Sequence, residues 1–311
     1  MATRHGDDTT KTPAGAPRWR GFSALGARVD APALAPGLYV VATPIGNLAD
    51  VTLRALATLA AADVILAEDT RVSRRLLDRY SITTPLTPYH EHNAAEARPA
   101  ILARLAAGEA LALISDAGTP MISDPGFKLA AEAVAAGVAV TSVPGPSAAL
   151  AALTSAALPT DRFFFEGFLP PKAAGRRERI NALAAIPATL VFYEAPSRLA
   201  EALADLAAEL GPRPAAVARE LTKLYEETRR ATLPELAALY AAEGAPKGEI
   251  VIVVGPPLEA PPPDEATLDK AVLAALDTLS VKDAAAAVAA QTGLPRREVY
   301  ARALRLQGSR R

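Results

Sequence analysis

The sequence contains no cysteine and only three histidines, His5, His90 and His92. The lack of cysteine excludes disulfide bonds, thiolate zinc sites, iron–sulfur clusters and a cysteine nucleophile. With so few histidines, a Ser–His–Asp triad or a histidine metal site would have to use the short stretch 90–92. A metal ion there would need a third ligand from elsewhere in the chain, so we expect no metal site.

The chain also lacks an excess of either charge, with 33 Lys and Arg against 34 Asp and Glu in 311 residues. A protein of net charge −1 does not bind nucleic acid through bulk charge, so such a contact must use local basic patches. Residues 1–20 are polar, unlike a secretory signal, and no run of about 18 apolar residues occurs. We therefore expect no leader and no membrane span, and a cytoplasmic location.

Half of the residues are hydrophobic, which suffices for a sizeable core. From residue 38, short apolar runs alternate with amphipathic segments, a pattern typical of an α/β fold with a largely parallel sheet. Strands are expected at 38–42, 64–67, 111–114, 138–143, 189–193, 215–218 and 250–254. Helices are expected at 53–61, 71–79, 94–107, 127–136, 147–157, 198–210 and 234–242. The chain length favours two α/β domains, which we place at 37–146 and 147–258, with a basic connector over 170–179.

The N-terminal segment differs from this pattern. Residues 1–36 are rich in Ala, Pro, Gly and Arg and show no periodicity. Such a composition predicts a disordered tail, for which Trp19 and Phe22 are the available anchors.

The C-terminal segment follows a Pro-rich linker and is expected to be helical over 265–311. Ser280 is suited to cap a helix over 281–291, Gly293 to end it, and Pro295 to open the next helix. Two short helices joined by a glycine-containing turn resemble a helix-turn-helix.

Each expected strand is followed by a loop rich in glycine, proline, hydroxyl and carboxylate residues. These loops are 43–50, 68–71, 115–126, 144–147, 194–198 and 219–223. Each loop alone is equally typical of a turn. In open α/β sheets, however, ligands bind beyond the carboxyl ends of strands, so six such loops predict one cleft between two domains. The chain has no G-x-G-x-x-G, G-x-x-x-x-G-K-[ST], H-E-x-x-H or G-x-S-x-G motif, which disfavours the common dinucleotide, P-loop, zinc-protease and hydrolase sites.

Taken in order, these loops resemble the tetrapyrrole-methylase superfamily of S-adenosylmethionine-dependent methyltransferases. The matching stretches are Tyr39–Leu48, Ala67–Arg71, Tyr89–Asn93, Ile114–Pro120, Ser123–Gly126, Pro144–Ser147, Phe192–Pro196, Arg219–Lys223 and Gly248–Glu249. They are most similar to the ribosomal members, which methylate the ribose 2′-hydroxyl of cytidine 1402 in 16S rRNA and carry an appended helix-turn-helix. Ser197 is a departure, because many relatives have histidine there.

The resemblance implies a fold, a cofactor and a set of contacts. Members of the superfamily bind S-adenosylmethionine in a cleft between two α/β domains and are typically homodimers. Carried over by position, cofactor contacts are expected at Pro44, Asp116, Gly118, Thr119, Met121, Ile122, Ser147 and Ala148, with Leu169, Tyr193 and Glu249 closing the pocket. Small residues such as Gly118 and Ala148 let backbone amides approach a ligand.

Methyl transfer to a ribose hydroxyl needs positioning and either a base or a polarising group, because the protonated hydroxyl is a poor nucleophile. The candidates around the expected cleft are Glu68, Asp69, His90 and Lys223, with His92 and Glu220 beside them. Alternatively, Glu68 pairs with Arg71 and only holds a loop. The sequence does not identify the base.

RNA contacts would depend on three basic clusters. They comprise Arg71 and Arg74 with Arg75 and Arg79, then Lys172, Arg176 and Arg177 with Arg179, and Arg296 and Arg297 at the C-terminal end. Each cluster alone is equally well explained as a solvated face. Two other functions stay open: a tetrapyrrole C-methyltransferase, which needs no basic clusters, and a nucleic-acid-binding protein without enzymatic activity. We predict a 2′-O-methyltransferase whose partner is 16S rRNA or the small ribosomal subunit.

Overall fold

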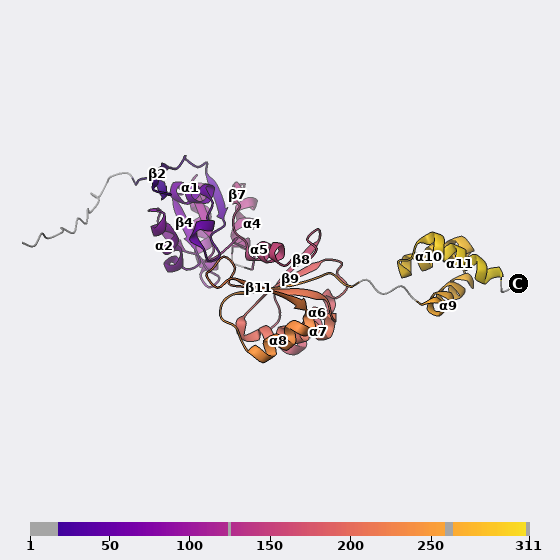
Figure 1. Ribbon diagram of the computed structural model, residues 1–311. Helices are drawn as coiled ribbons and strands as arrows, with labels where there is room; N and C mark the ends of the chain where they lie inside the picture. The colour runs from indigo at the N-terminus through magenta and orange to yellow at the C-terminus, as the bar shows by residue number, and fades with distance from the viewer. Residues whose placement is uncertain (1–17, 124–125, 259–263, 309–311) are drawn as a thin grey trace, which may run out of the picture. The chain divides into compact units, whose positions relative to one another are not determined.

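The computed structural model describes residues 18–123, 126–258 and 264–308 (Figure 1). The chain divides into two compact units, of which the first ends at Pro257 and the second begins at Leu258. The first unit contains a short hairpin and two five-stranded sheets, and the second unit is helical.

The first sheet is parallel throughout, in the order β5-β4-β6-β3-β7. Its strands are β3 (Gly37–Val41), β4 (Val64–Ala67), β5 (Leu86–Pro88), β6 (Ala110–Ile114) and β7 (Val140–Val143). The helices on it are α1 (Leu53–Ala61), α2 (Thr70–Arg79), α3 (Ala94–Ala106) and α4 (Phe127–Ala135). Alternate side chains of β4 enter different cores: Ile65 packs with α1 and α2, and Leu66 with α3 and α4. Because both faces are buried at the centre of the sheet, the inner strands β3, β4 and β6 are nearly continuous apolar runs, whereas the edge strands β5 and β7 are not.

The second sheet is mixed, in the order β11-β10-β12-β9-β8, and only β8 and β9 pair in parallel. Its strands are β8 (Phe163–Phe168), β9 (Thr189–Glu194), β10 (Pro214–Arg219), β11 (Glu227–Thr232) and β12 (Ile250–Val254). One face packs against α6 (Ala173–Leu183), α7 (Leu199–Leu210) and α8 (Leu233–Glu243). The other face packs against α5 (Ala148–Ser155) and against Ile45, which comes from the loop after β3.

Every strand and helix that the sequence predicts between residues 38 and 254 is present, with small differences at the ends. Three strands, β5, β8 and β11, and the short 3-10 helices 48–50 and 196–198 are additional. The predicted basic connector 170–179 is wrong over most of its length, because α6 begins at Ala173. Ile180 and Leu183 of that helix are buried in the core of the second sheet, which gives the segment a packing partner.

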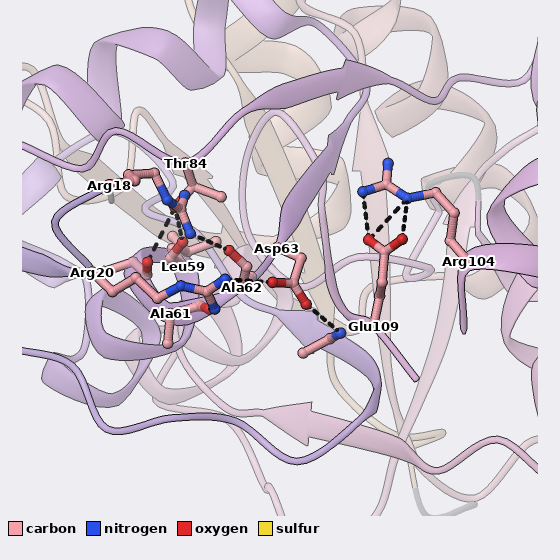
Figure 2. A network of polar contacts seen from close by, with 11 residues as sticks. Arg18, Arg20, Leu59, Ala61, Ala62, Asp63, Thr84, Arg104 and Glu109 are labelled. Carbon is pink, nitrogen blue, oxygen red and sulfur yellow. Dashed lines mark hydrogen bonds and ion pairs between the residues drawn. The ribbon is translucent and has the colours of Figure 1, made fainter. Parts of the chain in front are cut away.

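Residues 18–36 correct the prediction of a disordered tail. β1 (Gly21–Ala24) and β2 (Ala27–Asp30) form an antiparallel hairpin. Arg18 donates to the Ala62 carbonyl at 2.7 Å and Arg20 to the Ala61 carbonyl at 2.5 Å, at the C-terminal end of α1 (Figure 2). Carbonyls there have no intrahelical partner and favour cations, so the arginines fix the segment. The remaining residues of the predicted tail, 1–17, lie outside the described residues.

The second unit contains α9 (Glu265–Leu276), α10 (Val281–Thr292) and α11 (Arg296–Gly308). The predicted cap and stop of α10 are confirmed. The Ser280 side chain accepts a hydrogen bond from the Asp283 amide, and Gly293 ends the helix in the left-handed conformation. Arg302 of α11 pairs with Asp269 of α9 at 2.6 Å, so this arginine holds the helices together.

A buried ion network joins α6 to α7. Arg176 Nε lies 2.7 Å from Asp205 Oδ2, and Arg177 Nε lies 2.6 Å from Asp205 Oδ1. The Arg176 and Asp205 side chains are only 2% and 5% exposed. Burial alone raises the pKa of Asp205, but the hydrogen bonds from both arginines outweigh it and hold this pKa below its ordinary value. The carboxylate is therefore ionised in the folded protein at neutral pH.

We predict that Asp205→Asn lowers the free energy of unfolding by about 3–5 kcal/mol at pH 7, because the buried Arg176 loses its buried counter-charge and keeps only the exposed Glu201, 3.3 Å away. The stabilisation by the wild-type carboxylate is complete above the unfolded-state pKa of about 3.9 and is lost as pH falls through the lower folded-state pKa. Urea unfolding of both proteins from pH 7 downward measures the effect. A difference that stays constant below pH 4 would contradict this account.

Candidate active site

The loops after β3, β6 and β7 are bound to one another at the carboxyl edge of the first sheet. Thr43 and Gly118 exchange backbone hydrogen bonds of 2.9 and 3.0 Å. The Thr119 hydroxyl donates to the Pro146 carbonyl at 3.1 Å. Because parallel strands end at the same edge, loops that are distant in sequence form one surface there, as the sequence predicts.

A cavity of about 400 Å³, which we call the central cavity, lies between this surface and the second sheet. The first sheet contributes residues of the loops after β3, β6 and β7, and the second contributes Phe168 and residues of the loops next to β9 and β12. Of the predicted cofactor contacts, seven line it: Gly118, Thr119, Ile122, Ser147, Ala148, Tyr193 and Glu249. Its volume is within the range of small-molecule sites.

A second cavity, of about 500 Å³, adjoins the central cavity and is lined by Val72, Ser73, Arg75 and Leu76 of α2. We call it the α2 cavity. The predicted cofactor contacts Pro44 and Asp116 line this cavity instead of the central one, and so does Lys223. Three residues line both cavities: Ile45, Ala117 and Glu249.

A third cavity, of about 540 Å³, is lined by Ala94, Ala95 and Arg98 of α3 and is named the α3 cavity. It contains Met121, a predicted cofactor contact, and Glu68, a predicted catalytic residue. Its lining shares one residue, Ser123, with the central cavity.

Leu169 is the one predicted cofactor contact that the structure removes from all three cavities, as the described residues define them. Its side chain is 1% exposed and belongs to the core under the second sheet. Conversely, Glu194 lines the central cavity but was absent from the predicted site. Burial raises the pKa of Glu194, and Arg198 lies 3.3 Å from its Oε1. The sequence placed Glu194 and Arg198 in the loop after a strand, but gave no sign that the Glu194 side chain is buried.

An ion cluster crosses the edge of the α2 cavity. Lys223 Nζ lies 2.8 Å from Glu220 Oε1 and 3.0 Å from Glu249 Oε2. Burial lowers the pKa of Lys223, but the two carboxylates outweigh it and raise this pKa above its ordinary value. The hydrogen bond from Lys223 is the main cause that lowers the pKa of Glu220. Lys223 is therefore a cation at neutral pH and is not suited to act as a base.

The loop that carries Lys223 has an unfavourable backbone conformation. Glu220 and Thr222 have φ angles of +51° and +67°, which residues with a Cβ rarely adopt. Two glycines make room for the ion cluster. A Cβ at Gly46 would lie 2.4 Å from Lys223 Cγ, and one at Gly248 would lie 2.3 Å from Glu220 Cγ. Strained residues of this kind cluster at functional sites.

The other predicted catalytic residues lie apart from this cluster. Asp69 accepts hydrogen bonds from the Arg71 side chain and backbone, which lower its pKa to about 2 and make it a weak base. Its own amide donates to Asp116 Oδ1 at 2.9 Å. His90 lines none of the three cavities, as far as the described residues define them. Arg71 pairs with Asp69 at 2.7 Å, and the alternative that Glu68 also pairs with Arg71 stays a prediction.

The predicted RNA contacts are partly on the surface. Arg71, Arg74, Arg75 and Arg79 lie on the exposed face of α2, and Arg75 also lines the α2 cavity. Arg176 is a correction, because it is buried in the ion network with Asp205. Arg177 shares that network but is 59% exposed, and Lys172 is exposed. In the second unit, Arg296 and Arg297 are exposed at the start of α11.

No group of three or more His, Asp or Glu among the described residues is arranged to hold a metal ion, and the His90 and His92 rings instead pack edge-on with centroids 6.0 Å apart. None of the described helices is both long and apolar enough to cross a membrane.

We predict that Gly248→Ala destabilises the protein more than Gly244→Ala. Both glycines have positive φ angles, +99° and +81°, which residues with a Cβ rarely adopt, so each alanine incurs a backbone cost of at least about 1–2 kcal/mol. Only the Gly248 Cβ meets other atoms, which adds about 1–3 kcal/mol as Glu220 is displaced. Urea unfolding of the two variants isolates this packing cost, and equal destabilisation would refute it.

Comparison with known proteins places the chain in a family. Residues 37–237 match the family Tetrapyrrole (Corrin/Porphyrin) Methylases, and residues 262–307 match the RsmI C-terminal HTH domain. A solved uroporphyrin-III C-methyltransferase from Thermus thermophilus, complexed with S-adenosyl homocysteine, has the same fold. Its TM-score is 0.51 at 22% identity, over 70% of this chain and 97% of that chain.

Curated relatives are closer in sequence. The ribosomal RNA small subunit methyltransferase I of Mesorhizobium japonicum is 54% identical, over 88% of this chain and 93% of its own length. The protein of that name from Pseudomonas aeruginosa is 48% identical, over 87% of this chain and 98% of its own length. The chain therefore belongs to the tetrapyrrole (corrin/porphyrin) methylase family and, within it, to the ribosomal RNA small subunit methyltransferase I group.

Proposed function

We propose that the protein transfers a methyl group from S-adenosylmethionine to the ribose 2′-hydroxyl of cytidine 1402 in 16S rRNA. The observation that carries this proposal is the central cavity, which shares three lining residues with the α2 cavity beside a helix with four exposed arginines. A methyltransferase needs one site for the donor and one for the acceptor, and here the two sites share a boundary. The names of the curated relatives support ribosomal RNA as the acceptor.

The central cavity suits S-adenosylmethionine, which supplies an activated methyl group when bound. Phe168 and Tyr193 offer aromatic surface, and their ring centroids lie 5.7 Å apart. Gly118 has a φ of +78° and carries no side chain, so the backbone there is open to a ligand. Glu249 would close this pocket at its boundary with the α2 cavity. Asp116 and Pro44 would then bound the acceptor side.

The acceptor side suits an RNA backbone. Arg71, Arg74, Arg75 and Arg79 present guanidinium groups on one exposed face of α2. Guanidinium groups bind phosphates and position a nucleic acid without reading its sequence. A local patch of this kind is what a chain of net charge −1 needs to hold RNA. Lys172, Arg296 and Arg297 extend the proposed contact set.

The family resemblance also leads us to propose a homodimer that acts in the cytoplasm on the small subunit. Light scattering of the purified chain tests the dimer.

The experiment that tests the function combines purified protein, labelled S-adenosylmethionine and small subunits from cells that lack the enzyme. We expect one 2′-O-methylated cytidine per 16S rRNA after nuclease digestion and mass spectrometry. Naked 16S rRNA in a parallel reaction distinguishes the free nucleic acid from the assembled subunit as substrate. A methyl group on a base, or on no nucleotide, would overturn the proposal.

We predict that Gly118→Arg abolishes calorimetric binding of S-adenosylmethionine, because the side chain would fill the central cavity. Gly137→Arg is the matched control. Its φ of +76° is close to the +78° of Gly118, and a Cβ at Gly137 meets no atom within 4 Å. Backbone strain is therefore similar in both variants. Equal binding by both would place the donor elsewhere, and so would equal loss of binding in two folded variants.

A further inference from the structure

Glu249 occupies a special position between the two cavities. Of the three residues that line both the central and the α2 cavity, Ile45 and Ala117 are apolar, and Glu249 alone has a titratable side chain. Methyl transfer takes place where donor and acceptor meet, so a group that removes the acceptor proton must lie at this boundary. The boundary therefore selects Glu249 from among the acidic residues nearby.

The other carboxylates near the cavities are less well placed. Asp69 is bound to Arg71 and has a pKa of about 2. Glu68 lines only the α3 cavity, and Asp116 lines only the α2 cavity. Glu220 lines none of the three, as the described residues define them. Glu194 lines only the central cavity, and Glu91 lines only the α3 cavity. None of these carboxylates spans the donor and acceptor sites.

The surrounding residues hold Glu249 in place. Lys223 Nζ bonds Glu249 Oε2 at 3.0 Å and is itself held by Glu220 Oε1 at 2.8 Å. Glu220 Oε1 also accepts from the Glu249 backbone amide at 3.0 Å. Glu249 is thus fixed through both its side chain and its backbone. Its side chain is still 71% exposed, so an acceptor and water can reach it.

We propose that Glu249 is a catalytic residue, the general base that accepts the proton of the acceptor 2′-hydroxyl. This inference rests on the proposed function. As the ribose oxygen attacks, an O–C bond forms and the S–C bond of the donor breaks, and its electron pair returns to sulfur. The hydroxyl proton moves to the Glu249 carboxylate and then to solvent. Lys223 is a positioning residue that orients this carboxylate, and Glu220 positions Lys223.

The test measures methyl transfer to small subunits by Glu249→Gln, Glu249→Asp and Glu249→Ala in the full chain. Loss of a positioned base lowers kcat by about 10²–10⁴-fold, so we expect that loss in the Gln and Ala variants. The Asp variant should recover part of the rate. The Kd for S-adenosylmethionine and the KM for subunits should change by less than about threefold, because binding is not the step affected.

Rescue by added formate separates a base from a structural role. A small carboxylate can occupy the space left in Glu249→Ala and accept the proton, so kcat should rise with formate concentration. In Lys223→Met, the Glu249 carboxylate is still present, so formate should have little effect on kcat. Lys223→Arg keeps the positive charge and should retain more activity than Lys223→Met. Glu209→Gln, on α7 and away from the three cavities, is the matched control and should retain wild-type kcat.

The outcomes distinguish this inference from the proposed function. If the wild type forms no 2′-O-methylcytidine, both fail. If the wild type is active and Glu249→Gln keeps kcat within threefold, the inference alone fails. It also fails if Glu249→Ala loses S-adenosylmethionine binding to the extent that it loses activity, because Glu249 would then be only a donor contact.

Discussion

The arrangement of the site depends on the packing of Ile45 against the second sheet. This side chain comes from the loop after β3, is 6% exposed, and belongs to the apolar cluster that contains Val191 and Val251. The first sheet thus places one of its own loops in the core of the second. Burial of a whole isoleucine side chain stabilises by about 1.5–3 kcal/mol, enough to fix the loop in one position. Both the central cavity and the α2 cavity have Ile45 in their walls.

The ion cluster depends on this apolar contact. The residue after Ile45 is Gly46, which lies against the methylene groups of Lys223. The next amide, that of Asn47, donates to the Thr222 hydroxyl at 3.2 Å. A carboxylate–ammonium pair that is partly exposed contributes little stability by itself. Here the apolar packing fixes the backbone, and the charges then adopt one geometry in spite of the strain at Glu220 and Thr222. The cluster is therefore better explained by function than by stability.

The sequence predicted the regular elements well, because their signals are local. Apolar periodicity located the strands, and capping residues such as Ser280 and Gly293 located the ends of α10. The N-terminal hairpin was missed because its partners lie far along the chain. Arg18 and Arg20 bind carbonyls more than 40 positions away, and the predicted anchor Phe22 is buried against α1. Arg176 was misplaced for a similar reason. A run of basic residues resembles a surface, and its buried partner Asp205 lies 29 residues further along the chain.

The site was predicted at the level of loops and not of cavities. Parallel strands place their following loops at one edge, so Gly118 and Ser147 were expected near one ligand. Glu249, which precedes β12, was expected there only from the family resemblance. The sequence does not show which cavity each side chain lines, because this depends on how the two sheets pack against each other. Asp116 and Gly118 are two residues apart, yet they line different cavities.

That separation has a chemical consequence. A donor and an acceptor that each have their own cavity can bind independently, and an acceptor as large as a ribosomal subunit need insert only one nucleotide. The α2 cavity opens beside the exposed arginines of α2, so phosphates would be held outside while a ribose enters. Glu249 then needs to reach only the boundary between the cavities. With the donor and acceptor sites proposed above, the division between Asp116 and Gly118 would allow a methylase fold to serve a polymeric acceptor without a change to the donor site.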